Sequence, residues 1–81
     1  MNLYLISQSV NKGYDTYDSA VVCAKSAKEA QRTHPSGSPM YTATKPDIWA
    51  WCSPEAVEVE LIGKAKKGTK KGVICASFNA G

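Results

Sequence analysis

The alternation of apolar and polar positions predicts four β-strands. The first, Leu3 to Gln8, is apolar on both sides, which favours burial of much of both faces. A polar reversal, Ser9 to Asp18, leads to a second strand over Ser19 to Ala24. In the third strand, Val57 to Leu61, apolar residues alternate with two glutamates, which is typical of a half-buried strand. The fourth strand is the apolar run from Val73 to Phe78.

A capping box between the second and third strands predicts one short helix. In Ser26-Ala-Lys-Glu29 the serine hydroxyl accepts from the third helical amide, and the glutamate carboxylate reaches back to the cap amide. The helix therefore begins at Ala27. It ends near His34, because Pro35 disfavours helical angles in the residue before it. Ala27 and Ala30 are expected to face the sheet, so the helix lies close against it.

The long segment from residue 35 to residue 54 holds all four prolines, both tryptophans and Tyr41, and it has neither helical nor strand periodicity. Near its end, Ser53-Pro54-Glu55 predicts a single helical turn. Residues 63 to 72 form a reversal, so the third and fourth strands are expected to pair as an antiparallel hairpin. The sequence thus predicts one α+β domain over residues 1–81. It has a single four-stranded, mainly antiparallel sheet with one short helix on one face.

The small size of the chain predicts self-association. A domain of 81 residues buries only about 60 % of the surface that its unfolded chain exposes. In the final strand Val73 and Cys75 are expected on one side, with Ile74 and Phe78 on the other, so neither face is polar. A two-turn helix does not cover such a sheet. We therefore expect a homo-oligomer, most simply a twofold dimer, that docks through a sheet face or an edge strand.

The cysteines and the N-terminus favour a cytoplasmic protein without a metal or cofactor. Cys23, Cys52 and Cys75 are odd in number, and two of them lie in apolar runs, as reduced core thiols do. Neither they nor His34 have the short ligand spacing of a structural zinc site. The N-terminus lacks a basic region, and no run approaches the roughly 18 apolar residues of a membrane span. No membrane partner is expected.

The positive charge is confined to one end of the sequence. Residues 1–63 carry five Lys/Arg and seven Asp/Glu, whereas residues 64–81 carry five lysines and no acid, which gives the net charge of +3. Lys66, Lys67 and Lys70 are candidates for binding a phosphate or an acidic partner. A solvated hairpin tip explains the same residues. A nucleic-acid polymer is not expected, because only one short loop is basic.

Aromatic and hydroxyl side chains form the second candidate site. Tyr14, Asp15, Thr16, Tyr17 and Ser19 lie close together in the sequence, and such groups hold a nucleobase or a ribose. A turn stabilised by its aspartates is the structural alternative. Trp49 and Trp51 are candidates for stacking on a ligand or anchoring an interface. Alternatively, one of them covers the sheet and the other remains available for contact.

A catalytic set is missing from the sequence. His34 is the only histidine, and a nucleophile–base pair would require it to act with Ser26, Ser36 or a cysteine, without an oriented acid. Its place before Pro35 favours a cap at the C-terminus of the helix. There are no paired carboxylates and no phosphate-binding glycine loop. We therefore expect a binding protein and not an enzyme.

Three segments, GYDTYDSAVVCA, SAKEAQRTHP and the terminal GVICASFNAG, together resemble a family of small, functionally unassigned accessory proteins of bacteriophages and prophages. The resemblance covers both ends of the chain and not residues 36–51. It implies a context in which small phage proteins occupy a host component, and it assigns no role to any residue.

These observations together predict a non-catalytic immune-evasion protein that binds and sequesters a small phosphorylated, nucleotide-type signal of bacterial immunity. The alternative is a protein–protein inhibitor of a host defence enzyme, acting as anti-CRISPR proteins do, through its loop tryptophans or a sheet edge. A structural or assembly role is the third possibility.

Overall fold

The computed structural model describes residues 1–38 and 48–80. Its elements are β1 (Asn2–Ser7), β2 (Thr16–Ala24), α1 (Ala27–Gln31), the 3₁₀ turn η1 (Pro54–Ala56), β3 (Glu58–Lys64) and β4 (Gly72–Asn79). They form one four-stranded antiparallel sheet with one short helix, which confirms the predicted fold class. The largest differences from the expected boundaries are three residues each, since β2 already begins at Thr16, β3 extends to Lys64 and α1 ends at Gln31.

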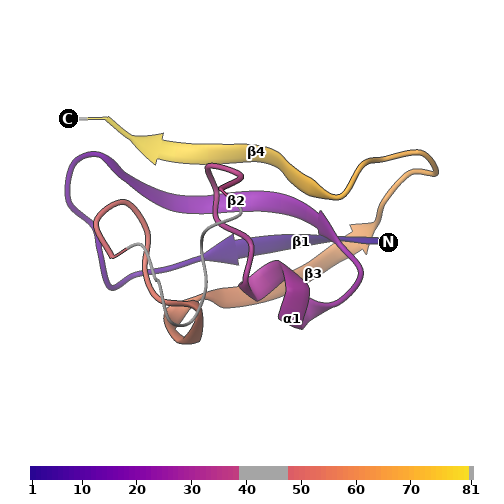
Figure 1. The fold of residues 1–81 in the computed structure, drawn as a ribbon, viewed down its shortest axis with the longest axis horizontal. Helices are drawn as coiled ribbons and strands as arrows, with labels where there is room; N and C mark the ends of the chain where they lie inside the picture. The colour runs from indigo at the N-terminus through magenta and orange to yellow at the C-terminus, as the bar shows by residue number, and fades with distance from the viewer. Residues whose placement is uncertain (39–47, 81) are drawn as a thin grey trace.

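The order of strands in the sheet is β3-β1-β2-β4, so the predicted hairpin of the third and fourth strands is wrong. These two strands are the opposite edges, and residues 65–71 connect them around one end of the sheet (Figure 1). Three strand spacings measure about 14 Å, a distance that seven residues span easily. Because β1 is apolar on both sides, it takes a central position and pairs with both β2 and β3.

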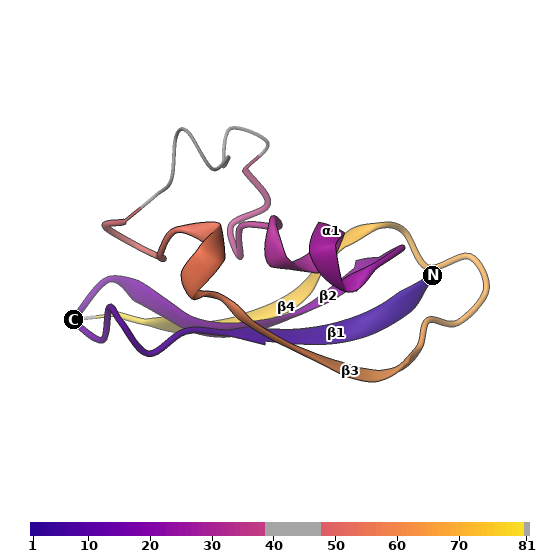
Figure 2. The same ribbon diagram turned by 90° about the horizontal axis from the view of Figure 1, so that it is seen from below.

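One face of the sheet is covered. Figure 2 shows α1 and η1 on the same side of the four strands. The buried side chains of this layer come from the two central strands, from α1 and from the segment before β3; they are Tyr4, Ile6, Ala20, Val22, Ala24, Ala30, Trp51, Cys52 and Val57. No element of the described residues covers the other face, where Leu3 and Leu5 of β1 are half-buried.

An irregularity in β4 changes the expected pattern of its side chains. Val73 pairs with Val22, but Cys75 pairs with Val21, so Ile74 is an extra residue between two regular pairs. Since Val22 belongs to the core and neighbouring residues of β2 face opposite sides, Val73 lies on the helix side and Cys75 on the open side. The prediction that these two residues share a face is therefore wrong. Alternation alone does not reveal a bulge.

The capping box is present with one change. The Ser26 hydroxyl accepts from the amide of Glu29 at 3.2 Å, and the Glu29 carboxylate accepts from the amide of Lys25, also at 3.2 Å, instead of the cap amide. The helix has only five residues, so Ala30 is its single buried position, and Ala27, which was expected to face inward, is exposed. Early termination also places the C-cap at Arg32, which corrects the cap role predicted for His34.

The two tryptophans have opposite environments. Trp51 is completely buried in the core, whereas Trp49 is 85 % exposed. The prediction that one tryptophan covers the sheet while the other remains at the surface is confirmed. Trp51 is among the largest fully buried side chains, so it fills the space that a short alanine-faced helix leaves above the sheet.

We expect Trp51→Ala to lower the free energy of unfolding by about 3–5 kcal/mol, because it removes a buried aromatic side chain and leaves a cavity. Trp49→Ala is the matched control and changes stability by less than about 0.5 kcal/mol. Urea titrations followed by far-ultraviolet circular dichroism measure both values. Equal losses in the two variants would contradict this account of the core.

Candidate ligand-binding site

The predicted ligand contacts lie at opposite ends of the sheet. Thr16, at the start of β2, pairs with Asn79 at the end of β4, whereas Cys23 pairs with Gly72, directly after the lysines. Figure 1 shows the turn between β1 and β2 at one end of the molecule and the lysine-bearing connection at the other. Within one chain, residues 14–19 and Lys66, Lys67 and Lys70 therefore do not contact the same small ligand.

Much of the segment from residue 13 to residue 16 stabilises its own turn. The Thr16 hydroxyl donates to the carbonyl oxygen of Gly13 at 2.6 Å, and the side chain of Asn79 donates to the same oxygen at 3.1 Å. The amide of Asp15 donates to the carbonyl oxygen of Asn79 at 2.6 Å, and Asp15 has a φ of 60°. Thr16 is buried, while Tyr14 and Asp15 are exposed. The structural alternative thus accounts for Thr16.

Tyr17 and Ser19 belong to different surroundings. The ring of Tyr17 makes edge contacts with Phe78, at a centroid distance of 4.8 Å, and with His34, at 5.9 Å. Its phenol ring is thus part of the packing beneath the residues that follow α1. Ser19 pairs with Ser7 on one side and with Ser77 on the other, in the middle of the sheet. These two candidates do not converge on one cavity.

Gln8 organises the turn between β1 and β2, a role that the sequence did not reveal. Its side-chain oxygen accepts from the amides of Val10 and Asn11 at 2.9 and 2.8 Å. Its side-chain amide donates to the carbonyl oxygens of Asn11 and Tyr17 at 2.7 and 2.9 Å. Gln8 is buried, so these four bonds satisfy every strong acceptor and donor direction of the side chain.

Asn11 connects this turn to the segment that precedes η1. Its side-chain amide lies within hydrogen-bond distance of the carbonyl oxygens of Ile48, Trp49 and Trp51, at 2.9, 2.9 and 3.2 Å. The connection places exposed Trp49 beside the turn that carries Tyr14, which is 77 % exposed. Of the predicted contacts, these two aromatic side chains are therefore brought to the same end of the molecule.

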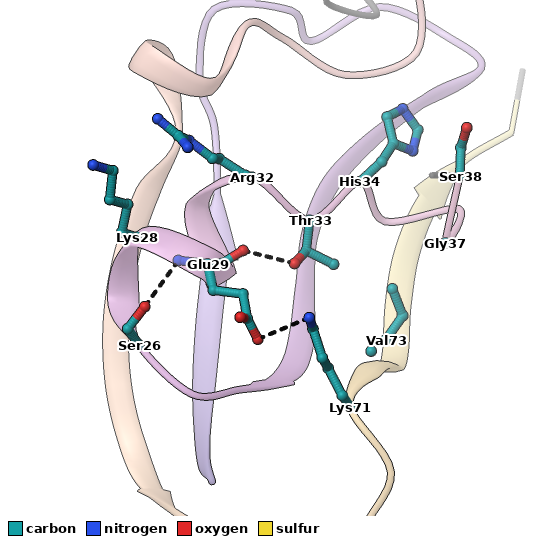
Figure 3. A pocket seen from close by; sticks show the side chains of 11 residues that line it. Ser26, Lys28, Glu29, Arg32, Thr33, His34, Gly37, Ser38, Lys71 and Val73 are labelled. Carbon is teal, nitrogen blue, oxygen red and sulfur yellow. Dashed lines mark hydrogen bonds and ion pairs between the residues drawn. The ribbon is translucent and has the colours of Figure 1, made fainter. Parts of the chain in front are cut away.

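A cavity lies elsewhere, between α1, the residues after it and the start of β4. This α1–β4 pocket has a volume of about 580 Å³ (Figure 3). Its lining residues are Ser26, Lys28, Glu29, Arg32, Thr33, His34, Gly37, Ser38, Lys71, Gly72 and Val73. None of the predicted contact residues lines it, although Lys71 belongs to the same lysine-rich connection.

Three cations and one carboxylate determine the charge of the α1–β4 pocket. Lys28 and Arg32 are four residues apart and extend in the same direction from the helical segment, while Lys71 approaches Glu29 from the β4 side (Figure 3). The Lys71 ammonium lies 3.4 Å from the Glu29 carboxylate. The hydrogen bond from the Lys25 amide, followed by that from Lys71, lowers the pKa of Glu29, so it is ionised at neutral pH. The lining thus carries a net charge of about +2.

Spacing is the signal that identifies two of these cations. In the sequence Lys28-Glu-Ala-Gln-Arg32, positions four apart share one side of a helix, which places both charges together. Neither Lys28 nor Arg32 was among the predicted ligand contacts. Lys71 carries no such signal, because its contact with Glu29 joins residues from opposite ends of the chain.

His34 closes the far wall of the pocket. It is buried, and its Nδ1 accepts from the amide of Ser36 at 3.0 Å and lies 2.7 Å from the Ser36 hydroxyl. A serine and a histidine at this distance are the parts of a nucleophile–base pair. Here the same nitrogen also holds the serine backbone, and the His34 carbonyl accepts from Gly37 at 2.8 Å. The contact therefore stabilises a local turn.

The cysteines are spread over the sheet and the loop. Cys23 and Cys52 are buried, whereas Cys75 is exposed. Burial raises the pKa of the Cys52 thiol to about 11. Within residues 1–38 and 48–80 there is no group of three or more His, Cys, Asp or Glu side chains placed to hold a metal ion. In the same part of the chain, every helix is too short or too polar to cross a membrane.

Comparison with protein-family models finds no match for the chain. A search of curated proteins and a search of solved structures also find none. The resemblance to phage accessory proteins stays a prediction.

The cysteine environments predict a selective reaction with Ellman's reagent. At pH 8 a thiol with a pKa of about 11 is only roughly 0.1 % thiolate, the reactive form, so Cys52 reacts slowly. Buried Cys23 is protected by its position, and exposed Cys75 should account for the single fast equivalent. The fast phase should disappear in Cys75→Ser, and the remaining thiols should react in denaturant. Three fast equivalents from the native protein would contradict the structure.

Proposed function

We propose that the protein binds a small phosphorylated, nucleotide-type ligand in the α1–β4 pocket and acts by sequestering it. In this role it is a phage immune-evasion protein whose target is a signal of bacterial immunity. The observation that supports the proposal most directly is the cavity of about 580 Å³ with three cations and one carboxylate in its lining. Sites for small ligands have volumes of about 300–1,000 Å³.

The cations have distinct roles in this proposal. Arg32 offers a planar fork of donors that suits two phosphate oxygens, and Lys28 adds a point charge on the same side. Lys71 is paired with Glu29, and a ligand phosphate would replace that carboxylate as its partner. Val73, which is half-buried, supplies an apolar surface for the base or sugar.

Sequestration requires affinity but no chemical step. The ligand is held by charge-assisted hydrogen bonds, each worth about 1.5–3 kcal/mol. Lys66, Lys67 and Lys70 are exposed on the connection that ends at Lys71, so they raise the local positive potential without lining the pocket. This distribution favours anionic ligands in general, and the pocket selects among them by size.

We expect a cyclic mono- or dinucleotide from a panel of signalling nucleotides to raise the melting temperature of the protein. Arg32→Ala should weaken binding of the same nucleotide by about 10- to 100-fold, as expected from the loss of a charged hydrogen bond. Lys67→Ala removes an equal charge outside the pocket and should change the affinity less than about 3-fold. Isothermal titration calorimetry measures all three proteins.

The absence of any melting shift with millimolar nucleotides would refute the proposed ligand class. Equal losses in Arg32→Ala and Lys67→Ala would show that binding depends on net charge and not on the α1–β4 pocket.

A second function, inhibition of a host defence protein, is favoured by the aromatic end of the molecule. Val10, Tyr14, Ile48 and Trp49 are 61–85 % exposed there, and the Asn11 side chain fixes the last two relative to the turn. Rigid exposed aromatic side chains are typical of interface hot spots. Co-purification of a defence protein that is lost in Trp49→Ala and retained in Arg32→Ala would support this function over sequestration.

A further inference from the structure

β4 is an edge strand without the charged residues and prolines that protect many edges from pairing. It spans Gly72 to Asn79, and one of its sides pairs with β2, while no strand of residues 1–38 and 48–80 pairs with the other. Its sequence, GVICASFN, contains neither a charged residue nor a proline. The residues from Ile74 to Asn79 are all exposed, although they belong to a regular strand. A long, uncharged edge of this kind is a template for another strand.

The opposite edge has the contrary character. β3 carries Glu58, Glu60 and Lys64, so a second strand placed on this edge would meet charged side chains. The two edges of the same sheet thus differ in the charge of their side chains, which decides whether another strand can pair with them. Whatever pairs with the sheet is expected at β4.

The charges at the two ends of β4 indicate the occupant. Lys70 and Lys71 directly precede the strand, while Asp15 is hydrogen-bonded to Asn79 at its far end, and Asp18 accepts from Ser77 at 3.2 Å. When two copies of β4 lie antiparallel, the lysines of each copy approach the aspartates of the other. In a parallel arrangement like charges would meet. Two copies of β4 are therefore electrostatically complementary when they run antiparallel.

We propose that two copies of this chain associate through antiparallel pairing of their β4 strands, about a twofold axis near the middle of the strand. The product is one continuous sheet of eight strands, four from each copy. A twofold axis perpendicular to the sheet keeps both α1 helices on the same face. The pairing supplies hydrogen-bond partners for the open side of β4 and covers part of Ile74 and Phe78, which are 50 % and 47 % exposed.

The association also changes the α1–β4 pocket, a consequence that rests on the proposed function. Val73 lines the pocket near the start of β4. Phe78 pairs with Tyr17 near the far end of β4, and the two rings are in contact. Antiparallel pairing brings Phe78 of the partner subunit toward Val73 and adds an aromatic wall beside the cations. The aromatic and lysine-rich segments that lie apart in one chain thus meet across the axis.

Light scattering behind a sizing column tests the pairing without any ligand. We expect the mass of a dimer at micromolar concentration. Ser77→Lys places a charge on β4 that faces its own copy, and it should raise the dissociation constant at least about 10-fold. Glu60→Lys introduces the same residue on β3 and should leave the mass unchanged. Circular dichroism checks that both variants are folded.

A short bismaleimide provides a second measurement. It should join two subunits through exposed Cys75 on β4, and a variant that combines Cys75→Ser with Glu60→Cys on β3 should not be joined. A monomeric mass at every concentration, or equal cross-linking at both edges, would overturn the pairing. Dimer formation without nucleotide binding would refute the proposed function alone, and nucleotide binding by a monomer would refute the pairing alone.

Discussion

The structure depends on the central position of β1, which is paired along both of its edges and buried on one of its faces. Tyr4 and Ile6 lie in the core under Trp51, while Leu3 and Leu5 occupy the open face. A strand with apolar side chains in both directions is most stable with a neighbour on each side. This requirement places β2 and β3 beside β1 and leaves β4 to pair with the outer side of β2. The α1–β4 pocket lies between α1 and the start of β4, where Lys71 reaches Glu29.

The predictable part of the fold is the part that local chemistry decides. The serine and glutamate of the capping box are three residues apart, so the start of α1 at Ala27 follows from the sequence. The positions of the strands follow from the alternation of apolar and polar residues. The pairing of the strands does not follow from it, because β3 and β4 are neighbours along the chain, and a hairpin is the usual expectation for neighbouring strands. The apolar character of β1 on both sides already indicates a central strand, but it does not decide whether β4 pairs with β3 or with β2.

The candidate site was less predictable, since it depends on contacts between distant segments. The side chain of Lys71 reaches Glu29, which precedes it by more than forty positions. Polar residues that the sequence marks as ligand contacts, such as Thr16, instead stabilise a turn. Gln8 gave no signal, although it makes four hydrogen bonds inside that turn. A buried polar side chain with a structural role and an exposed one with a binding role look alike in a single sequence.

The connection around the end of the sheet also has a consequence for how the chain folds. Of the strands that pair, only β1 and β2 are neighbours along the chain, whereas Asn2 pairs with Lys64, and β2 pairs with a strand that begins at Gly72. Closing loops of this length costs entropy before the contacts that repay it have formed. The β1–β2 hairpin is thus the expected folding nucleus. Both edge strands come from the second half of the chain and pair later. For its size the domain should refold in milliseconds or longer, and a ribosome must release most of the chain before the first strand gains its second neighbour.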